Sequence, residues 1–333
     1  MIYTQPFHPG SIQHNRFLVT GGAGFIGSNI VEYLITHGAE KVTVLDNLST
    51  GFEVNIQPYL GLPNFVFIKG DICDFDSCQK AAQGVQHVFH QAALGSVPRS
   101  VKDPITTNKV NVDGFLNILV AARDQGVKRL VYASSSSVYG DQPDSPKIES
   151  IIGNALSPYA VTKRTNELYA NVFAETYGIE VIGLRYFNIF GPRQSPTGEY
   201  AAAIPLFMDA LLCQKSAFIN GDGLQSRDFT FVANAVQANI KAMFTKQGGA
   251  IGQVYNIAVG EKKSIKDLYF LLQGFAQSQQ EPIYRENRKG DIRDSLASIE
   301  KAEKLLGYAP THKLEAGLRI TFDWFKSVYY PHK

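Results

Sequence analysis

Short apolar runs alternate with longer amphipathic stretches along the first half of the chain. Val, Ile, Leu and Phe dominate the short runs, which is typical of buried parallel strands. The strands that this pattern predicts are residues 16–20, 41–46, 65–69, 87–90, 129–134 and 180–185. The helices predicted between them are residues 28–37, 74–83, 104–125 and 159–177. Strands separated by helices of this length imply right-handed βαβ units and a parallel sheet.

The regular alternation fades beyond residue 185. Residues 186–193 have the composition of a loop, and residues 254–258 form one more short apolar run. Further helices are predicted at residues 203–212, 232–245, 264–278, 299–306 and 314–330. We therefore predict an α/β fold in which a doubly wound parallel sheet of the Rossmann type precedes a smaller, mixed α/β C-terminal lobe.

Composition and charge exclude several function classes. The chain of 333 residues is 44% hydrophobic and 19% charged, as in an ordinary soluble protein. Lys and Arg number 32 against 30 Asp and Glu, so no nucleic-acid partner is expected. No apolar run approaches the roughly 20 residues of a membrane span, and residues 1–15 do not resemble a secretory signal.

The cysteines and histidines add no metal chemistry. Cys73, Cys78 and Cys213 stand at unremarkable spacings, which favours reduced thiols and a cytoplasmic protein. No cluster of His, Cys and carboxylates has the spacing of metal ligands, so no metal is expected.

A glycine-rich turn follows the first predicted strand. Gly21, Gly24 and Gly27 lie between this strand and the helix that begins near residue 28. Such glycines allow a tight turn, let the backbone approach a pyrophosphate, and direct a helix N-terminus at it. Asp46 ends the second strand, where a carboxylate can accept both adenosine-ribose hydroxyls and would repel a 2′-phosphate. The pattern indicates NAD rather than NADP.

Other polar or small residues also fall at predicted strand ends. They are Asp71 after the third strand, Ala92 after the fourth and Ser135 after the fifth. Ligands of parallel sheets bind at the carboxyl ends of the strands, so these residues are expected to meet at one edge. Asp71 could contact the adenine amino group there.

Tyr159 and Lys163 stand four residues apart at the start of the helix that follows the serine-rich residues 134–137. Residues i and i+4 share one face of a helix, so a phenol and an ammonium are presented together. A nearby cation stabilises the phenolate, and a tyrosine pKa of about 10 must fall before the group can act as a base near neutrality. The pair is a candidate catalytic site.

With these motifs together, the chain resembles the extended short-chain dehydrogenase/reductases that act on nucleotide sugars. Within that superfamily it is most similar to bacterial UDP-N-acetylglucosamine 4-epimerases. The stretches that carry this resemblance are residues 90–100, 157–163, 185–188, 191–194 and 290–293. It implies that UDP-GlcNAc and UDP-GalNAc are interconverted through a 4-keto intermediate with tightly bound NAD. UDP-Glc and UDP-Gal, or UDP-GlcNAcA and UDP-GalNAcA, are implied as further substrates.

The resemblance also assigns roles to individual residues. Tyr159 would take the proton from the C4 hydroxyl, Lys163 would lower the Tyr159 pKa, and Ser135 would hydrogen-bond the C4 oxygen. Which serine of residues 134–137 acts at this oxygen stays open. The implied cofactor-binding residues are Gly21, Gly24, Phe25, Ile26, Gly27, Asp46, Asn47, Ser49, Thr50, Gly51, Asp71, Ile72, Gln91, Ala92, Ala93, Asn111, Ser134, Tyr159, Lys163 and Tyr186. The implied substrate-binding residues are Ser96, Arg99, Ser135, Ser136, Ser137, Tyr159, Asn188, Ala203, Arg227, Arg288, Asp291 and Ser295.

Domain boundaries follow from these assignments. We expect an N-terminal arm at residues 1–15 and an NAD-binding domain at residues 16–185, to which residues 230–258 return. Residues 186–229 and 259–333 would form the lobe that binds the UDP-sugar.

Two other function classes share the same motifs. A nucleotide-sugar 4,6-dehydratase carries Asp-Glu after its catalytic Thr, and a UDP-glucuronate decarboxylase carries Glu in the second of these positions. Ser136 and Ser137 stand there in this chain, which argues against both. A non-catalytic NAD-sensing protein is disfavoured because Ser135, Tyr159 and Lys163 are all present.

The resemblance makes two further predictions. A homodimer would form through a four-helix bundle of residues 104–125 and 159–177 from each subunit. Its apolar stripe would consist of Leu116, Leu119, Leu168, Val172 and Phe173. Ser295, four residues past Asp291, would leave room for an N-acetyl group where a tyrosine would exclude it.

Overall fold

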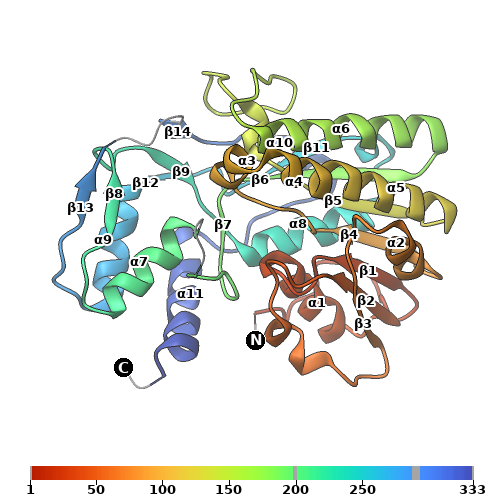
Figure 1. The fold of residues 1–333 in the computed structure, drawn as a ribbon, viewed down its shortest axis with the longest axis horizontal. Helices are drawn as coiled ribbons and strands as arrows, with labels where there is room; N and C mark the ends of the chain where they lie inside the picture. The colour runs from red at the N-terminus through yellow and green to blue at the C-terminus, as the bar shows by residue number, and fades with distance from the viewer. Residues whose placement is uncertain (1, 198–200, 287–292, 332–333) are drawn as a thin grey trace.

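A seven-stranded parallel sheet with helices on both faces lies beside a smaller lobe in the computed structural model, which describes residues 2–197, 201–286 and 293–331 (Figure 1). The strand order is β11-β6-β5-β4-β1-β2-β3, and every neighbouring pair is parallel. The strands are β1 (Arg16–Thr20), β2 (Lys41–Asp46), β3 (Phe65–Lys69), β4 (His87–His90), β5 (Arg129–Ser135), β6 (Glu180–Tyr186) and β11 (Val254–Ile257). The predicted Rossmann-type sheet is confirmed.

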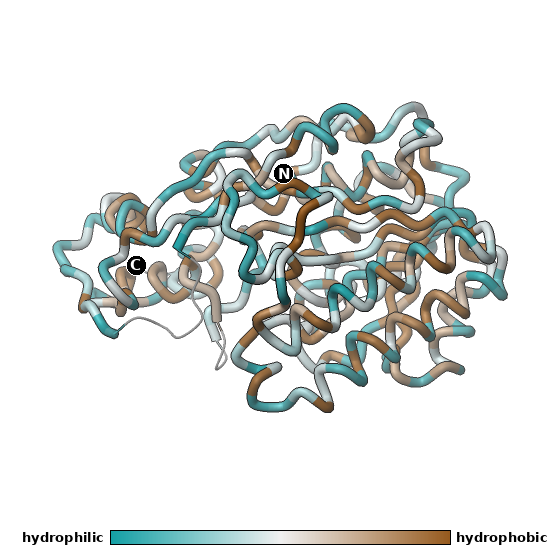
Figure 2. Tube along the Cα trace, turned by 90° about the horizontal axis from the view of Figure 1, so that it is seen from above, coloured by the Kyte–Doolittle hydropathy of each residue, from teal (hydrophilic) through white to brown (hydrophobic). Residues whose placement is uncertain are grey.

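Alternate side chains of the strands supply two separate apolar cores. In β1, Phe17 and Val19 belong to one cluster, whereas Leu18 belongs to the other. Of the helices that flank the sheet, α1 (Phe25–Thr36) and α8 (Val232–Phe244) contribute to the first cluster, which continues into the C-terminal lobe. The second cluster is covered by α2 (Phe75–Ala82), α5 (Gly114–Asp124) and α6 (Pro158–Tyr177). Figure 2 shows hydrophobic stretches along the central strands and alternating polar and apolar residues along the surface helices.

The helix predicted at residues 104–125 is interrupted. It consists of α4 (Pro104–Asn108), a π-helical turn (Lys109–Asp113) and α5. The turn contains Asn111, whose side chain accepts the Leu94 N–H (2.8 Å) and donates to the Leu94 carbonyl (3.1 Å). These two bonds join the π-helical turn to Leu94 and thereby fix the loop that follows β4. π-turns of this kind are frequent at functional sites.

The segment around Ser96 and Arg99, for which no element was predicted, forms a short helix, α3 (Val97–Lys102). The Ser96 hydroxyl caps it by accepting the Arg99 N–H (3.2 Å), and Pro98 lies in the first turn. A serine cap followed by an early proline is a helix-start signal that the prediction did not use.

The described part of the C-terminal lobe is built from short strands and four helices. Its strands are β7 (Ile189–Phe190), β8 (Phe218–Asn220), β9 (Ser226–Asp228), β10 (Thr230–Phe231), β12 (Lys262–Ser264), β13 (Ile283–Arg285) and β14 (Asp294–Ser295). Its helices are α7 (Ala203–Leu212), α9 (Ile265–Ala276), α10 (Glu300–Leu306) and α11 (Leu314–Tyr329). The strands of the lobe pair as β10 with β7, β13 with β8, and β12 and β14 on either side of β9.

The predicted apolar stripe does not form one surface. Leu119 and Phe173 are buried in the second core cluster of their own subunit, which corrects the prediction for these two residues. Leu168 and Val172 are exposed, because they lie on the face of α6 that points away from the sheet.

Two further sequence predictions can be compared with the structure. Cys73, Cys78 and Cys213 are free thiols. None of the helices in the described part of the chain combines the length and apolar character that a membrane crossing requires.

Candidate active site

The turn between β1 and α1 depends on two glycines. Gly21 has a φ of 67°, and a Cβ there would lie 2.7 Å from the Ala92 nitrogen. A Cβ on Gly27 would overlap the carbonyl oxygen of Gly21. Gly24 at the helix cap has no side chain to bond the first-turn N–H groups, and Gly24 to Gly27 line the adjoining cavity. This turn can accept a pyrophosphate closely, as NAD requires.

A cavity of about 420 Å³ lies along the carboxyl ends of the strands. The predicted cofactor-binding residues that line it are Gly21, Gly24, Phe25, Ile26, Gly27, Asp46, Asn47, Ser49, Thr50, Gly51, Asp71, Ile72, Gln91, Ala92, Ala93, Ser134, Tyr159, Lys163 and Tyr186. Ser135 and Asn188 line it as well. Lining residues that the sequence reasoning missed include Leu45, Gly70 and Ala133, all at or beside strand ends where the same rule could have found them.

Asp46 is fixed at one end of this cavity. Its two carboxylate oxygens accept the N–H groups of Ala23 (2.9 Å) and Leu48 (2.8 Å). Burial raises the pKa of Asp46, and these two hydrogen bonds oppose the rise. The carboxylate thus joins β2 to the glycine turn, at a place suited to a ribose diol and unsuited to a phosphate.

Tyr159 and Lys163 lie at the other end, on the first two turns of α6. Ser157 caps this helix by accepting the Ala160 N–H (3.2 Å), and Pro158 occupies the first helical position. The Lys163 ammonium lies 6.0 Å from the centroid of the Tyr159 ring and donates to the Ala133 carbonyl (2.8 Å). The predicted pair is therefore brought together at the end of β5.

Lys163 is buried and Tyr159 is partly buried, and removal from water changes the acidity of both groups. It raises the pKa of Tyr159, while a hydrogen bond with Ser135 acts in the opposite direction. It lowers the pKa of Lys163 to about 8, against which the Glu167 carboxylate acts. The predicted lowering of the Tyr159 pKa by Lys163 is therefore not seen, because removal of the phenol from water is the largest influence and raises that pKa.

The geometry distinguishes the serines of residues 134–137. Ser135 lines the cavity and hydrogen-bonds Tyr159. Ser134 donates to Glu167 (2.6 Å), and Ser137 donates to the Ser135 hydroxyl (3.0 Å). Ser136 and Ser137 do not line the cavity, so the arrangement favours Ser135 as the serine that faces a reacting group.

Glu167 supports this site, although the sequence reasoning did not identify it. It follows Lys163 by one turn of α6 and is buried. Its carboxylate accepts two hydrogen bonds from Arg185 (2.8 Å each) and one from Ser134. Glu167 thereby joins α6 to β5 and β6, one helical turn after Lys163. Its spacing of four residues from Lys163 was the available signal.

A second cavity of about 300 Å³ lies in the C-terminal lobe, where residues of β7, α7, β8 and β9 line it. Asn188, Ala203 and Arg227, three of the predicted substrate-binding residues, line it. Sequence reasoning missed other lining residues, notably Phe207, Phe218, Asn220, Gln225 and Phe229. Asn188 and Ile189 line both cavities, which therefore meet at this point.

Asn188 is held in an unusual backbone conformation, with a φ of 37°. Its side-chain amide donates to the Asp228 carbonyl (3.0 Å), and its own carbonyl accepts the Thr230 N–H (3.2 Å). The segment from β9 to β10 thus fixes the residue at which the cavities meet.

Other predicted site residues lie outside both cavities. Ser96 caps α3, and Asn111 holds Leu94 as described above. Ser295 is buried in β14, paired with Arg227 of β9. Arg288 and Asp291 lie outside the described residues.

Comparison with known proteins identifies the family. Residues 17–258 match the NAD dependent epimerase/dehydratase family. The chain belongs to this family. The predictions of family, NAD as cofactor and an NAD-dependent enzyme are thereby confirmed, and the glycine turn and Asp46 are suited to that cofactor.

Similar proteins include several 4-epimerases. A UDP-glucose 4-epimerase of Mycolicibacterium smegmatis is 37% identical over 314 residues, which cover 94% of this chain and 99% of that protein. The structure of a UDP-N-acetylglucosamine 4-epimerase from Methanobrevibacter ruminantium, in complex with UDP-N-acetylmuramic acid, is 40% identical with a TM-score of 0.88. That match covers 94% of this chain and 98% of the other.

A third similar structure is a UDP-glucuronic acid 4-epimerase from Bacillus cereus with UDP-glucuronic acid and NAD. It is 32% identical with a TM-score of 0.88, and the match covers 94% of this chain and all (100%) of that chain.

Proposed function

We propose that the protein is a UDP-N-acetylglucosamine 4-epimerase that interconverts UDP-GlcNAc and UDP-GalNAc through a 4-keto sugar. The observation that carries this proposal is that Ser135, Tyr159 and Lys163 line the first cavity, which meets the second at Asn188 and Ile189. The 40% identity to the Methanobrevibacter ruminantium UDP-N-acetylglucosamine 4-epimerase supports the choice of sugar.

The chain's own residues would divide the work as follows. Tyr159, as a phenolate stabilised by the Lys163 ammonium, accepts the proton of the C4 hydroxyl and later returns it. Ser135 orients the C4 oxygen by a hydrogen bond. NAD, when bound, supplies the acceptor and donor of the hydride. The glycine turn and Asp46 hold the dinucleotide at the far end of the same cavity.

The second cavity would hold the UDP part of the substrate. Phe207, Phe218 and Phe229 offer apolar faces for a nucleobase, and Asn220 and Gln225 offer amide groups beside them. Arg227 provides a cation for the diphosphate. Because this cavity meets the first at Asn188, a sugar linked to UDP would extend from it toward Tyr159.

The carboxylates in the two cavities support an epimerase over a dehydratase. Among the described lining residues, the carboxylates are Asp46 and Asp71, at the ends of β2 and β3. Two strands, β1 and β4, separate β2 from β5, which carries Ser135. Removal of water from the sugar needs an acid and a base near C5 and C6, whereas Ser136 and Ser137 stand in the positions that dehydratases and decarboxylases use.

Product analysis would separate the candidate functions. The purified protein is incubated with UDP-GlcNAc, and the nucleotide sugars are resolved chromatographically. We expect UDP-GalNAc to accumulate to an equilibrium that is also reached from UDP-GalNAc. A 4-keto-6-deoxy sugar from a hexose substrate, or carbon dioxide from UDP-glucuronate, would instead indicate a dehydratase or a decarboxylase. Binding of NAD without turnover of any of these sugars would indicate a sensing protein.

A second copy of the chain would cover the exposed side of α6. Leu168 and Val172 are 55% and 51% exposed, and Ile105 of the neighbouring α4 is 81% exposed. Apolar side chains gathered on paired helices are typical of a subunit interface. Light scattering at micromolar concentration should give the mass of a dimer, and a monomer would contradict the predicted four-helix bundle.

A further inference from the structure

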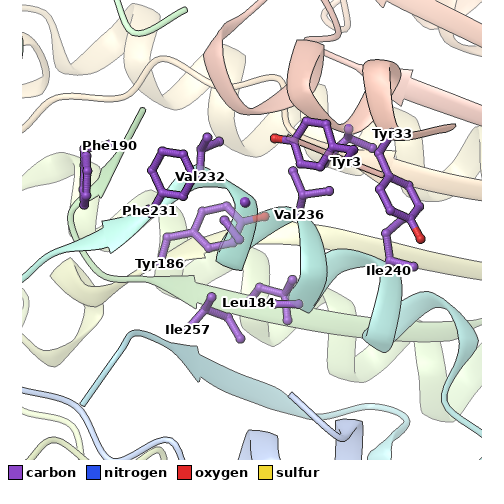
Figure 3. Close-up of a cluster of buried hydrophobic side chains, with 14 of the residues drawn as sticks. Tyr3, Tyr33, Leu184, Tyr186, Phe190, Phe231, Val232, Val236, Ile240 and Ile257 are labelled. Carbon is purple, nitrogen blue, oxygen red and sulfur yellow. The ribbon is translucent and has the colours of Figure 1, made fainter. Parts of the chain in front are cut away.

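The N-terminal arm, residues 2–15, is firmly packed against α1. Tyr3 is 1% exposed and Ile12 is fully buried. The Phe7 ring stacks on Tyr33 with centroids 5.3 Å apart, and the Phe7 N–H donates to the Tyr33 hydroxyl (2.6 Å). Figure 3 shows Tyr3 and Tyr33 in one cluster of buried side chains with Val236 of α8. The arm is thus part of the folded core, although the family match begins only at residue 17.

One hydrogen-bonded chain leads from the arm to the active site. The Tyr3 hydroxyl donates to the side-chain oxygen of Asn29 on α1 (2.7 Å), and both groups are buried. The amide nitrogen of Asn29 donates to the carbonyls of Phe25 (2.9 Å) and Pro192 (3.2 Å). Because the phenol supplies the proton for the oxygen, the amide group is held with its nitrogen toward Pro192.

Pro192 belongs to residues 187–194, the segment that follows β6. We call this segment the connecting loop, although it includes the two residues of β7. Asn188 and Ile189 of this loop line both cavities, and Gln194 lines the second. A second contact joins the loop to α1 because the Arg193 guanidinium pairs with Glu32. The first turn of α1 lines the cofactor cavity with Phe25 and Ile26. The junction of α1 with the connecting loop therefore positions the loop, which lines both cavities, relative to the helix that lines the cofactor cavity.

We propose that the N-terminal arm is a brace for this junction and that Tyr3 is a positioning residue of the active site. Its hydroxyl fixes Asn29, and Asn29 fixes the connecting loop at Pro192. The loop then holds the nucleotide end of the substrate in register with Tyr159. The last step rests on the proposed function, whereas the ordering of the loop does not.

Removal of the arm could unfold the protein, so the test uses a single hydroxyl. Tyr3→Phe keeps the buried ring and removes only the donor to Asn29. Hydrogen exchange followed by mass spectrometry should show amides of residues 189–194 exchanging about fivefold faster, which corresponds to the roughly 1 kcal/mol of one lost hydrogen bond. The KM for the UDP-sugar should rise by about the same factor with kcat within about twofold.

Tyr33→Phe is the matched control. It also removes a buried phenol that anchors the arm, but Tyr33 bonds Phe7 and His8 rather than Asn29. A role in stability alone predicts the same exchange in residues 189–194 for both variants. The proposal predicts the faster exchange only for Tyr3→Phe, and no further change when Tyr3→Phe is added to Asn29→Ala.

Each outcome can be read separately. Unchanged exchange in residues 189–194 of Tyr3→Phe, or equal changes in both variants, would overturn the brace. If the wild-type protein converts no UDP-GlcNAc, the proposed function fails, yet the exchange measurement still decides whether Tyr3 orders the loop.

Discussion

The parallel sheet and the C-terminal lobe position their cavity-lining residues by different means. In the sheet, Asp46 and Ser135 end strands of six and seven residues whose pairing with neighbours is continuous. In the lobe, the second cavity is lined from α7, loops, and strands of two or three residues. A proton transfer tolerates little misplacement of its groups, whereas binding tolerates more. The sheet is therefore suited to the reaction, and the lobe to selecting what enters it.

The largest effect should come from Tyr159→Phe, which tests the chemical role of the sheet edge. Loss of a general base reduces kcat by about 10²–10⁴-fold, and the partly buried ring should keep its packing. Steady-state kinetics would measure the loss, and calorimetry should show that the UDP-sugar still binds. Tyr169→Phe on the same helix, away from the lining residues, serves as control. Near-native turnover by Tyr159→Phe would remove the phenol from the reaction.

Gly27→Ala tests whether the cofactor depends on the glycine turn alone. The added Cβ would overlap the Gly21 carbonyl, so the turn must open and should lose bound dinucleotide. The measurement is the dinucleotide released per subunit on denaturation, with NAD rather than NADP expected from the wild type. Gly274→Ala in α9 is a matched change, since its Cβ meets nothing within 4 Å. Full occupancy in Gly27→Ala would contradict the assigned binding mode.

Ser295→Tyr tests whether the lobe selects the substrate without affecting the cofactor. Ser295 lies outside both cavities but is buried in β14, paired with Arg227, which lines the second cavity, so a larger side chain must displace its surroundings. Overpacking costs about 1–3 kcal/mol, which corresponds to a loss of about 5-fold to 150-fold for N-acetylated sugars. A tyrosine that reaches the N-acetyl group, as the resemblance implies, would spare UDP-Glc and UDP-Gal. An equal loss for all four sugars would show that it acts through Arg227 on the nucleotide that they share, and NAD content should not change in either case. If UDP-GlcNAc is converted at the native rate, selection depends on other residues.

The smallest effect concerns acid stability, which we expect to depend on the sheet. Burial lowers the pKa of His87 to about 4 and that of His90 to about 3, both in β4. Below an unfolded pKa of about 6.5, the unfolded chain binds protons that the folded state does not. The free energy of unfolding should therefore fall by about 1.4 kcal/mol per pH unit for each histidine.

Urea denaturation at about pH 6.5 and about pH 5.5 would measure this slope. His87→Gln should remove the contribution of one histidine from this slope. The variant should fold normally, because Asn15, the partner of His87, can bond an amide equally well. An unchanged slope would show that other groups control acid unfolding.

The same contrast explains how far the sequence alone predicts this protein. Six of the sheet strands were predicted because each is an apolar run of four to seven residues, which can be recognised without knowledge of its tertiary contacts. The glycine turn, Asp46, Tyr159 and Lys163 could be assigned because their spacing along the chain reflects local geometry. β11 was also expected as a short strand, but its pairing with β6 depends on contacts distant in sequence.

The lobe could not be predicted to the same depth. β9 pairs with β14, although the two strands are far apart in the sequence. β14 contributes two residues to this pairing, Asp294 and Ser295. Strands this short have no periodicity that a sequence pattern can detect. Phe218 and Asn220 were missed for the same reason, since only the tertiary fold brings β8 to the second cavity.

Helix α6 has a consequence for how the enzyme should respond to dilution. One face carries Tyr159, Lys163 and Glu167, and the opposite face exposes Leu168 and Val172. If a second subunit covers those leucine and valine side chains, association and reaction act on one rigid element. Specific activity should then decline at concentrations where the dimer separates, and the midpoint of that decline would report the dissociation constant of the subunits.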